Sequence, residues 1–280
     1  MDKYKTKMTI KKWFSFINLE KLSGKSQKAI QSFDAYVKKI TFERTLKLFL
    51  FAINDETNSL RHLDNQLVNP KLRKAIGVDE ISYSQLSRAL KALDSSVLME
   101  IFSQLLLLVH QQTEGQKNEK IYLVDSTTFS FSQPSYPWAK FRKTKSGVKL
   151  HLSVCFMEDG LLHPEQFEIS NAVEHDSDHL EVLVNKLTPK AKEIGKMYKS
   201  RWQIELFFKH IKQHMTIKKY FSKSEDGVVN QIILAMIVYL LTLLIKLELG
   251  LKQTIFQILR VFCSIQFENY DYFIRIFDPG

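Results

Sequence analysis

Cysteine, glycine and proline are all scarce in this chain of 280 residues, which has 2 Cys, 9 Gly and 6 Pro. Cys155 and Cys263 lie in separate apolar runs and show neither metal-ligand spacing nor a disulfide framework. This usage is typical of a reducing compartment, so we expect a cytoplasmic protein. The shortage of glycine and proline argues against long flexible linkers.

The chain also has little that suggests a membrane. The first residues, Met1 to Lys5, are polar and open no apolar segment of a signal peptide. The longest apolar run, Ile232 to Ile245, is interrupted only by Thr242 and is shorter than the about 20 residues that a membrane helix needs. The sequence therefore predicts a buried core helix here and no membrane partner.

Positive charge is in excess, with 40 Lys and Arg against 30 Asp and Glu and a net charge of +10. This excess favours a polyanionic partner, nucleic acid before membrane, although a basic but otherwise ordinary surface is the alternative. The length allows one large domain or two modest ones, each with its own hydrophobic core.

Residues 1–118 are predicted to be helical. Apolar residues recur at helical spacing over residues 42–53, 60–67 and 97–112, and Ser82 with Gln85 fits a capping box at the start of another helix. A short helix, a turn near Gly77 and this capped helix, which carries Arg88 and Lys91, match a helix-turn-helix. Plain helical packing explains the same pattern.

The apolar pattern changes its period after residue 120. Residues 121–129 form a short run rich in β-formers, residues 148–157 alternate, and a turn at Asp159-Gly160 leads to a return strand over residues 161–169. Helical patterns dominate again over residues 179–187, 188–220, 228–249 and 254–267. The sequence thus predicts an α+β fold with a central meander of three strands.

Asp125 lies at the end of the first predicted strand and is followed by three hydroxyl residues. A carboxylate in an apolar strand is costly to bury without a partner. A divalent cation such as Mg²⁺ is one such partner, because hard cations prefer carboxylate oxygens. The alternative is an aspartate that only caps the following turn.

A second candidate segment is basic and helical. On a helix, Glu205 shares a stripe of roughly 80° with four other side chains, while an apolar face lies beside it. The other members of the stripe are Tyr198, Arg201, Lys209 and Lys212, and the apolar residues are Ile204, Phe207, Phe208, Ile211 and Met215. One acid among these cations suits a metal ligand beside a phosphate backbone. A solvated face with Glu205–Lys209 ion pairing is the alternative.

These motifs resemble the insertion sequence 4 family of bacterial transposases. The spacing Tyr198-x2-Arg201-x3-Glu205-x6-Lys212 matches the family signature in full. The words at residues 123–128 and 141–151, and the N-terminal words at residues 36–39 and 82–85, are also similar to that family, so the resemblance covers nearly the whole chain.

The resemblance implies a ribonuclease-H-like core in which two aspartates and one glutamate hold two Mg²⁺ (or Mn²⁺) ions for cleavage and strand transfer of DNA. Asp125 matches the first acid and Glu205 the third, while Tyr198, Arg201 and Lys212 match residues near the DNA. It also implies binding of double-stranded DNA at the terminal repeats of an element, self-association on DNA, and a nucleoid-associated location. Residues 1–118 would then be the DNA-binding region and residues 119–280 the core.

The chain departs from the family between residues 179 and 198. The family has a fourth strand with the second aspartate there, followed by a largely β insertion, whereas this chain runs directly from one predicted helix into the next. The resemblance therefore implies a truncated core that lacks both. Four nearby acids could substitute for the missing one, and His175 with His179 could suggest a metal pair, although an exposed turn explains all of them. The acids are Glu174, Asp176, Asp178 and Glu181.

Three functional hypotheses follow from this departure. The chain is an active transposase, a catalytically inactive DNA-binding remnant that inhibits intact transposase, or a decayed product with an incompletely covered core. Cleavage of DNA separates the first from the second, and low solubility would indicate the third.

Overall fold

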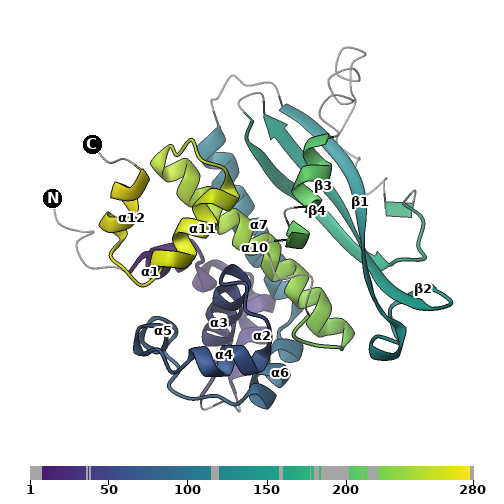
Figure 1. Ribbon diagram of the computed structural model, residues 1–280, viewed down its shortest axis with the longest axis horizontal. Coiled ribbons are helices and arrows are strands. Elements are labelled where there is room, and N and C mark those ends of the chain that lie inside the picture. Colours follow the sequence, from purple (N-terminus) through teal and green to yellow (C-terminus); the bar gives the residue numbers. More distant parts are fainter. Residues whose placement is uncertain are drawn as a thin grey trace. The chain divides into compact units, whose positions relative to one another are not determined.

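The computed structural model describes residues 8–35, 37, 39–114, 120–157, 160–176, 178–179, 183, 202–209, 211–213 and 220–277 (Figure 1). The contacts divide the chain into two compact units. Unit 1 comprises Met1–Glu114, Gln213–Ser222 and Asp226–Gly280, and unit 2 comprises Gly115–Lys212 and Lys223–Glu225. The C-terminal helices thus group with the N-terminal ones. The functional division at residue 118 stays a prediction.

Unit 1 is helical, and the described helices include every one that the apolar spacing predicts before residue 114. The α+β class, with helices at both ends of the chain, is confirmed. A final helix after residue 269 was not anticipated. The helices are α1 (Thr9–Phe14), α2 (Gly24–Asp34), α3 (Phe42–Asn54), α4 (Leu60–Gln66), α5 (Pro70–Ile76), α6 (Tyr83–Ala92), α7 (Ser95–Thr113), α10 (Glu225–Leu249), α11 (Ile255–Ile265) and α12 (Tyr270–Phe277), with a 3-10 turn at Leu19–Lys21.

The turn between α5 and α6 is formed by the residues that the sequence indicated. Gly77 ends α5 with a φ of 81°, a left-handed conformation that glycine adopts without strain. The Ser82 side chain accepts a hydrogen bond from the Gln85 backbone N–H, and the Gln85 side chain accepts one from the Ser82 backbone N–H. The predicted capping box is therefore confirmed.

Helix α10 supplies much of the core of unit 1. Its residues from Ile232 to Ile245 are all buried, as the sequence predicted for a core helix. By length and composition α10 could cross a membrane, but 94% of its apolar window is buried within the protein. The Asn230 amide, also fully buried, donates hydrogen bonds to the carbonyl oxygens of Leu90 (3.0 Å) and Leu93 (2.8 Å). Asn230 thereby satisfies carbonyls at the end of α6 that the helix leaves without partners.

The two ends of the chain meet within unit 1. The Thr9 backbone N–H donates to the Glu268 carbonyl oxygen at 2.8 Å, and Met8 forms an antiparallel bridge with Asn269. The buried Trp13 ring lies 5.1 Å from the Phe262 ring, centroid to centroid. The C-terminal helices are therefore part of the core that covers α1.

Unit 2 is built on an antiparallel sheet of four strands, β1 (Lys120–Ser132), β2 (Lys140–Arg142), β3 (Lys145–Met157) and β4 (Leu162–Asn171), with a 3-10 turn at Gln133–Ser135. The three long strands confirm the predicted meander, and β2 is an addition to it. Strand β3 lies in the centre and pairs with β1, β2 and β4. Within the described residues, β1 has β3 as its sole ladder partner.

Residues 202–209 and 211–213 are helical, and those up to Lys212 belong to the same unit as this sheet (green in Figure 1). The apolar face of this helix is buried at Ile204, Phe207, Phe208 and Ile211, whereas Glu205 and Lys209 are exposed. The division between apolar and charged faces is the one that the helical spacing predicts. Met215 lies outside the described residues.

Candidate active site

Asp125 lies in the middle of β1 and is half-buried. It pairs in register with Leu152 of β3, which in turn pairs with Phe167 of β4. Directly paired residues of neighbouring strands point to the same face of a sheet, so Asp125 shares its face with these two buried apolar side chains. The Asp125 Oδ1 accepts a hydrogen bond from the Ser126 backbone N–H at 2.8 Å, which fixes one carboxylate oxygen near the strand.

Lys212 links the helix of Glu205 to strand β1. Its Nζ donates a hydrogen bond to the Thr128 carbonyl oxygen at 3.0 Å and lies 5.2 Å from the centroid of the Phe129 ring. Phe129 is four residues after Asp125 and therefore lies on the same face of β1. Partial burial lowers the pKa of the Lys212 ammonium. The structure thus brings Lys212 of the signature to the strand that holds Asp125.

Of the other predicted site residues, the structure describes Glu205 and Lys209. Glu205 and Lys209 both lie on the exposed side of the helix. Tyr198 and Arg201 lie outside the described residues. Asp125 and Glu205 belong to one unit. Asp125 lies on the sheet and Glu205 on the helix, and Lys212 connects these two elements.

The opposite face of the sheet carries a cluster of ionisable side chains that the sequence does not predict. Ser126, His151 and Glu168 pair across β1, β3 and β4, on the face opposite to Asp125. The stretch after β4 folds over them. The polar cluster, as we call it, comprises Ser126, Lys149, His151, Glu168, Glu174, Asp176 and His179.

Asp176 has three partners in this polar cluster. Its Oδ1 accepts a hydrogen bond from the Ser126 hydroxyl at 2.8 Å and lies 3.2 Å from the Lys149 Nζ and 3.4 Å from the His151 Nδ1. Burial alone would raise the pKa of the Asp176 carboxyl, but the hydrogen bonds from Ser126 and Lys149 outweigh it and lower the pKa. Asp176 is therefore held as a carboxylate.

The two histidines of the polar cluster stack, with ring centroids 3.9 Å apart. His179 is bound on both sides, with Nδ1 at 2.7 Å from Glu168 Oε2 and Nε2 at 3.2 Å from Glu174 Oε2. These carboxylates raise the pKa of His179, the hydrogen bond to Glu168 most of all. Burial, followed by the nearby His179, lowers the pKa of His151. The pair therefore favours one charged and one neutral ring.

The sequence predicts an exposed turn before residue 180, and this prediction is wrong for His179, of whose side chain only 14% is accessible. The His175 side chain is exposed, as expected, and Glu181 lies outside the described residues. The partners of Asp176 lie on the face opposite to Asp125, so its present position does not complement Asp125 as a metal ligand. The signal that was missed is the alternation of β3, which puts Lys149 and His151 on one face.

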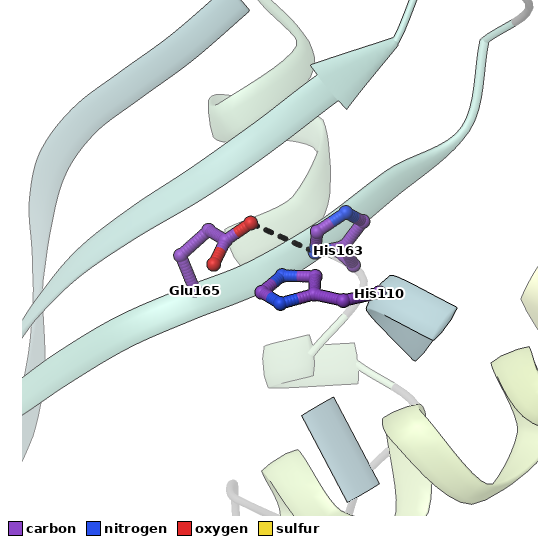
Figure 2. A group of neighbouring side chains, drawn as sticks. All are labelled: His110, His163 and Glu165. Carbon is purple, nitrogen blue, oxygen red and sulfur yellow. Dashed lines mark ion pairs between the residues drawn. The ribbon is translucent and has the colours of Figure 1, made fainter. Parts of the chain in front are cut away.

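A further histidine and acid lie side by side on β4 (Figure 2). The Nδ1 of His163 is 3.5 Å from the Glu165 Oε1, which makes an ion pair when the imidazole is protonated. His110, also drawn in Figure 2, belongs to unit 1 and is not counted with them. Two ligands are fewer than the three or four of a typical zinc site, so we assign no metal to this pair.

The thiols contribute no evident chemistry. Burial raises the pKa of Cys155 and of Cys263 to about 12. A thiol is nucleophilic as its thiolate, so neither side chain is activated near neutral pH.

Comparisons with known proteins bear directly on this arrangement. A family model described as "Transposase DDE domain" matches residues 182–241, which include Glu205 and Lys212. Residues 182–241 are therefore similar to the DDE domain of transposases. Such DDE domains depend in general on divalent metal ions.

Three relatives carry transposase names. The "Putative transposase y4zB" of Sinorhizobium fredii is 41% identical over 66 residues, which are 24% of this chain and 18% of the relative. The "Probable transposase for insertion sequence element IS5377" of Geobacillus stearothermophilus is 20% identical over 293 aligned residues, covering 73% of this chain and 76% of the relative. The "Putative transposase for insertion sequence element IS4SA" of Synechocystis is 29% identical over 106 residues, 35% of this chain and 31% of the relative. No solved structure matches this chain.

The donor set of this chain fits a hard divalent cation in part. Asp125 and Glu205 supply carboxylate oxygens, which Mg²⁺ and Mn²⁺ prefer, and the backbone contact of Asp125 holds one of its oxygens in place. Two carboxylates suit one ion. Two ions about 4 Å apart require further ligands that the described residues do not bring to this face of the sheet.

Proposed function

We propose that this chain binds double-stranded DNA and performs metal-dependent phosphodiester cleavage and strand transfer at the ends of a mobile element, with Asp125 and Glu205 as its catalytic acids. The observation that carries the proposal is the contact of Lys212 with β1, because it anchors the Glu205 helix on the strand and face of Asp125.

The spacing along both elements supports this pairing of acids. Glu205 precedes Lys212 by seven residues, about 10 Å along a helix. Asp125 precedes Thr128, the partner of Lys212, by three residues, about 10 Å along a strand. Along their own elements, the two acids thus lie at similar distances from the Lys212–Thr128 contact.

We propose Mg²⁺, or Mn²⁺, as the ion that these acids hold. When bound, such an ion activates a water or a 3′-hydroxyl and stabilises the leaving oxygen. The residues of the chain have other tasks. Asp125 and Glu205 orient the ion, and Lys209, exposed on the same helix, offers its ammonium to a phosphate of the DNA.

DNA contacts are proposed for Tyr198, Arg201, Lys209 and Lys212, which lie on either side of Glu205 in the sequence. The net charge of +10 supports a polyanionic partner. By resemblance, the specific sequences would be terminal repeats of the element, recognised with the help of residues 1–118 and by self-association on the DNA. Because the substrate would be genomic DNA, we propose that the protein is found at the nucleoid.

An inactive DNA-binding remnant is the alternative to this proposal. Among the described strands, β1 pairs with β3 alone, and none of them lies along its other edge. The Geobacillus comparison extends over 293 positions but covers only 73% of this chain, so part of that relative has no counterpart here. Both observations support a core shortened by an internal deletion.

Nicking of supercoiled plasmid by the purified protein with Mg²⁺ or Mn²⁺ tests the proposal. We expect nicking that is lost in Asp125→Asn and in Glu205→Gln, since each change removes a charged ligand but retains the size of the side chain. DNA binding is measured beside it in the absence of metal. Absence of nicking by folded protein that binds DNA would identify the remnant.

Asp176→Asn is the matched control for these variants. It removes a carboxylate of the same unit, but one that is bound to Ser126 and Lys149 on the opposite face. We expect nicking to persist. Loss of nicking in Asp176→Asn as well as in the other two variants, with stability unchanged, would make Asp176 the substitute acid and would contradict our assignment of faces.

A further inference from the structure

A hollow in unit 1 has no role in the chemistry proposed above. It has a volume of about 500 Å³ and lies between the start of α4 and the first two turns of α6. Its lining includes two arginines and several hydroxyl groups, and no acidic residue. The polar residues used below are Arg61, Tyr83, Ser84, Ser87 and Arg88.

The side chains of α6 that reach this hollow form one stripe. Ser84, Ser87 and Arg88 are three or four residues apart and therefore lie on one face of the helix, and Lys91 continues that face. Three of these four residues are exposed and Ser87 is half-buried. The opposite face of α6 is buried at Leu86, Ala89 and Leu90. The exposed stripe thus offers two cations and two hydroxyls, and no carboxylate.

Arg61 approaches the same hollow from α4. Its guanidinium carbon lies 5.0 Å from the centroid of the Tyr83 ring, a cation–π contact that restricts the arginine side chain. None of the acids that the structure describes forms an ion pair with Arg61 or Arg88. Two guanidinium groups without acidic partners, beside hydroxyl donors, match the donor set that proteins use for phosphate.

We propose that the hollow between α4 and α6 binds a phosphate group, with the DNA backbone as its source. Arg61 and Arg88 would each donate to phosphate oxygens, and the Ser84 and Ser87 hydroxyls would complete the contact. The inference rests on the proposed function only in taking DNA as the partner. The site lies in unit 1, whereas Asp125 and Glu205 lie in unit 2. It would be a second grip on DNA that does not require the catalytic acids.

The test is the salt dependence of binding by the full chain to a labelled 30-base-pair duplex, by fluorescence anisotropy without divalent metal. Each lost phosphate contact lowers the slope of log K against log salt by about 0.9. The double variant Arg61→Ala/Arg88→Ala should therefore lower the slope by about 1.8 and weaken binding by at least about tenfold. Circular dichroism checks that both arginine variants fold.

The matched control is Arg260→Ala/Arg275→Ala. These arginines are exposed on α11 and α12 of the same unit, so the control removes the same charge away from the hollow. We expect a slope close to that of the unchanged protein. Equal slopes for the two double variants would overturn DNA as the source, because the effect would then be one of net charge.

A second arm separates DNA from free phosphate. Thermal unfolding is measured with inorganic phosphate and with potassium chloride at matched ionic strength. A phosphate-dependent rise in Tm that is lost in Arg61→Ala/Arg88→Ala, with no specific change in DNA binding, would assign the site to free phosphate. Absence of both effects overturns the site. Failure of plasmid nicking affects neither readout and would count against the catalytic proposal alone.

Discussion

Gly147 of β3 lies where the sheet has no room for a side chain. A Cβ added there would be 2.9 Å from the Phe129 carbonyl oxygen, 3.3 Å from the Ala172 Cβ and 3.4 Å from Phe141 Cδ1. The nearest of these atoms is backbone and cannot rotate away. Gly147→Ala must therefore displace β1 from β3 beside the Lys212 contact. Overpacking of this kind costs roughly 1–3 kcal/mol.

A smaller favourable effect opposes this cost. Alanine restricts the unfolded chain more than glycine does, which stabilises the folded state by about 0.5–1 kcal/mol. The net loss of stability expected for Gly147→Ala is therefore up to about 2.5 kcal/mol. Hydrogen exchange of amides in β1 and β3 measures it within unit 2, beside urea denaturation of the whole chain.

Gly24→Ala is the control for this experiment. Gly24 begins α2, and an added Cβ would meet nothing within 4 Å. Its stability should stay unchanged or increase by up to about 1 kcal/mol. If the amides of β1 and β3 exchange as slowly in Gly147→Ala as in the unchanged protein, the close approach of the strands is refuted.

Two other groups of contacts make predictions. Acidic partners raise the pKa of His179 above its ordinary 6.5. The charged His179 therefore stabilises the fold fully below pH 6.5, and this stabilisation is lost as pH rises through the raised pKa. Burial lowers the pKa of His151, so His151 costs stability as pH falls below 6.5. His179→Gln should thus lower the free energy of unfolding more at pH 6 than at pH 8, and His151→Gln should lower it more at pH 8, as measured by urea denaturation. A variant that loses the same free energy at both pH values would contradict these contacts. Asn230→Leu should cost about 2–4 kcal/mol, because it leaves two buried carbonyls without donors, and a fall in Tm checks it.

Local sequence patterns predicted most of the secondary structure that the structure describes. Helical spacing, the capping box at Ser82 and the alternation over residues 148–157 each depend on neighbours within a few residues, so the sequence alone was sufficient for them. The polar cluster could not be predicted in the same way. Asp176 is 50 residues from its partner Ser126, and their contact depends on how the chain folds back after β4. Lys212 is likewise 84 residues from Thr128.

The polar cluster also bears on whether a nearby acid could restore a complete active site. To reach the face of Asp125, the Asp176 carboxylate would have to leave Ser126, Lys149 and His151 and pass to the other side of the sheet. Asp176 would lose the hydrogen bond from Ser126 and its ion pairs with Lys149 and His151, although solvent weakens these contacts because 56% of the Asp176 side chain is exposed. A metal would have to supply more than this difference from a site with an incomplete set of ligands. The present contacts of Asp176 thus argue against it as a ligand on the face of Asp125, and the proposed ligands stay Asp125 and Glu205.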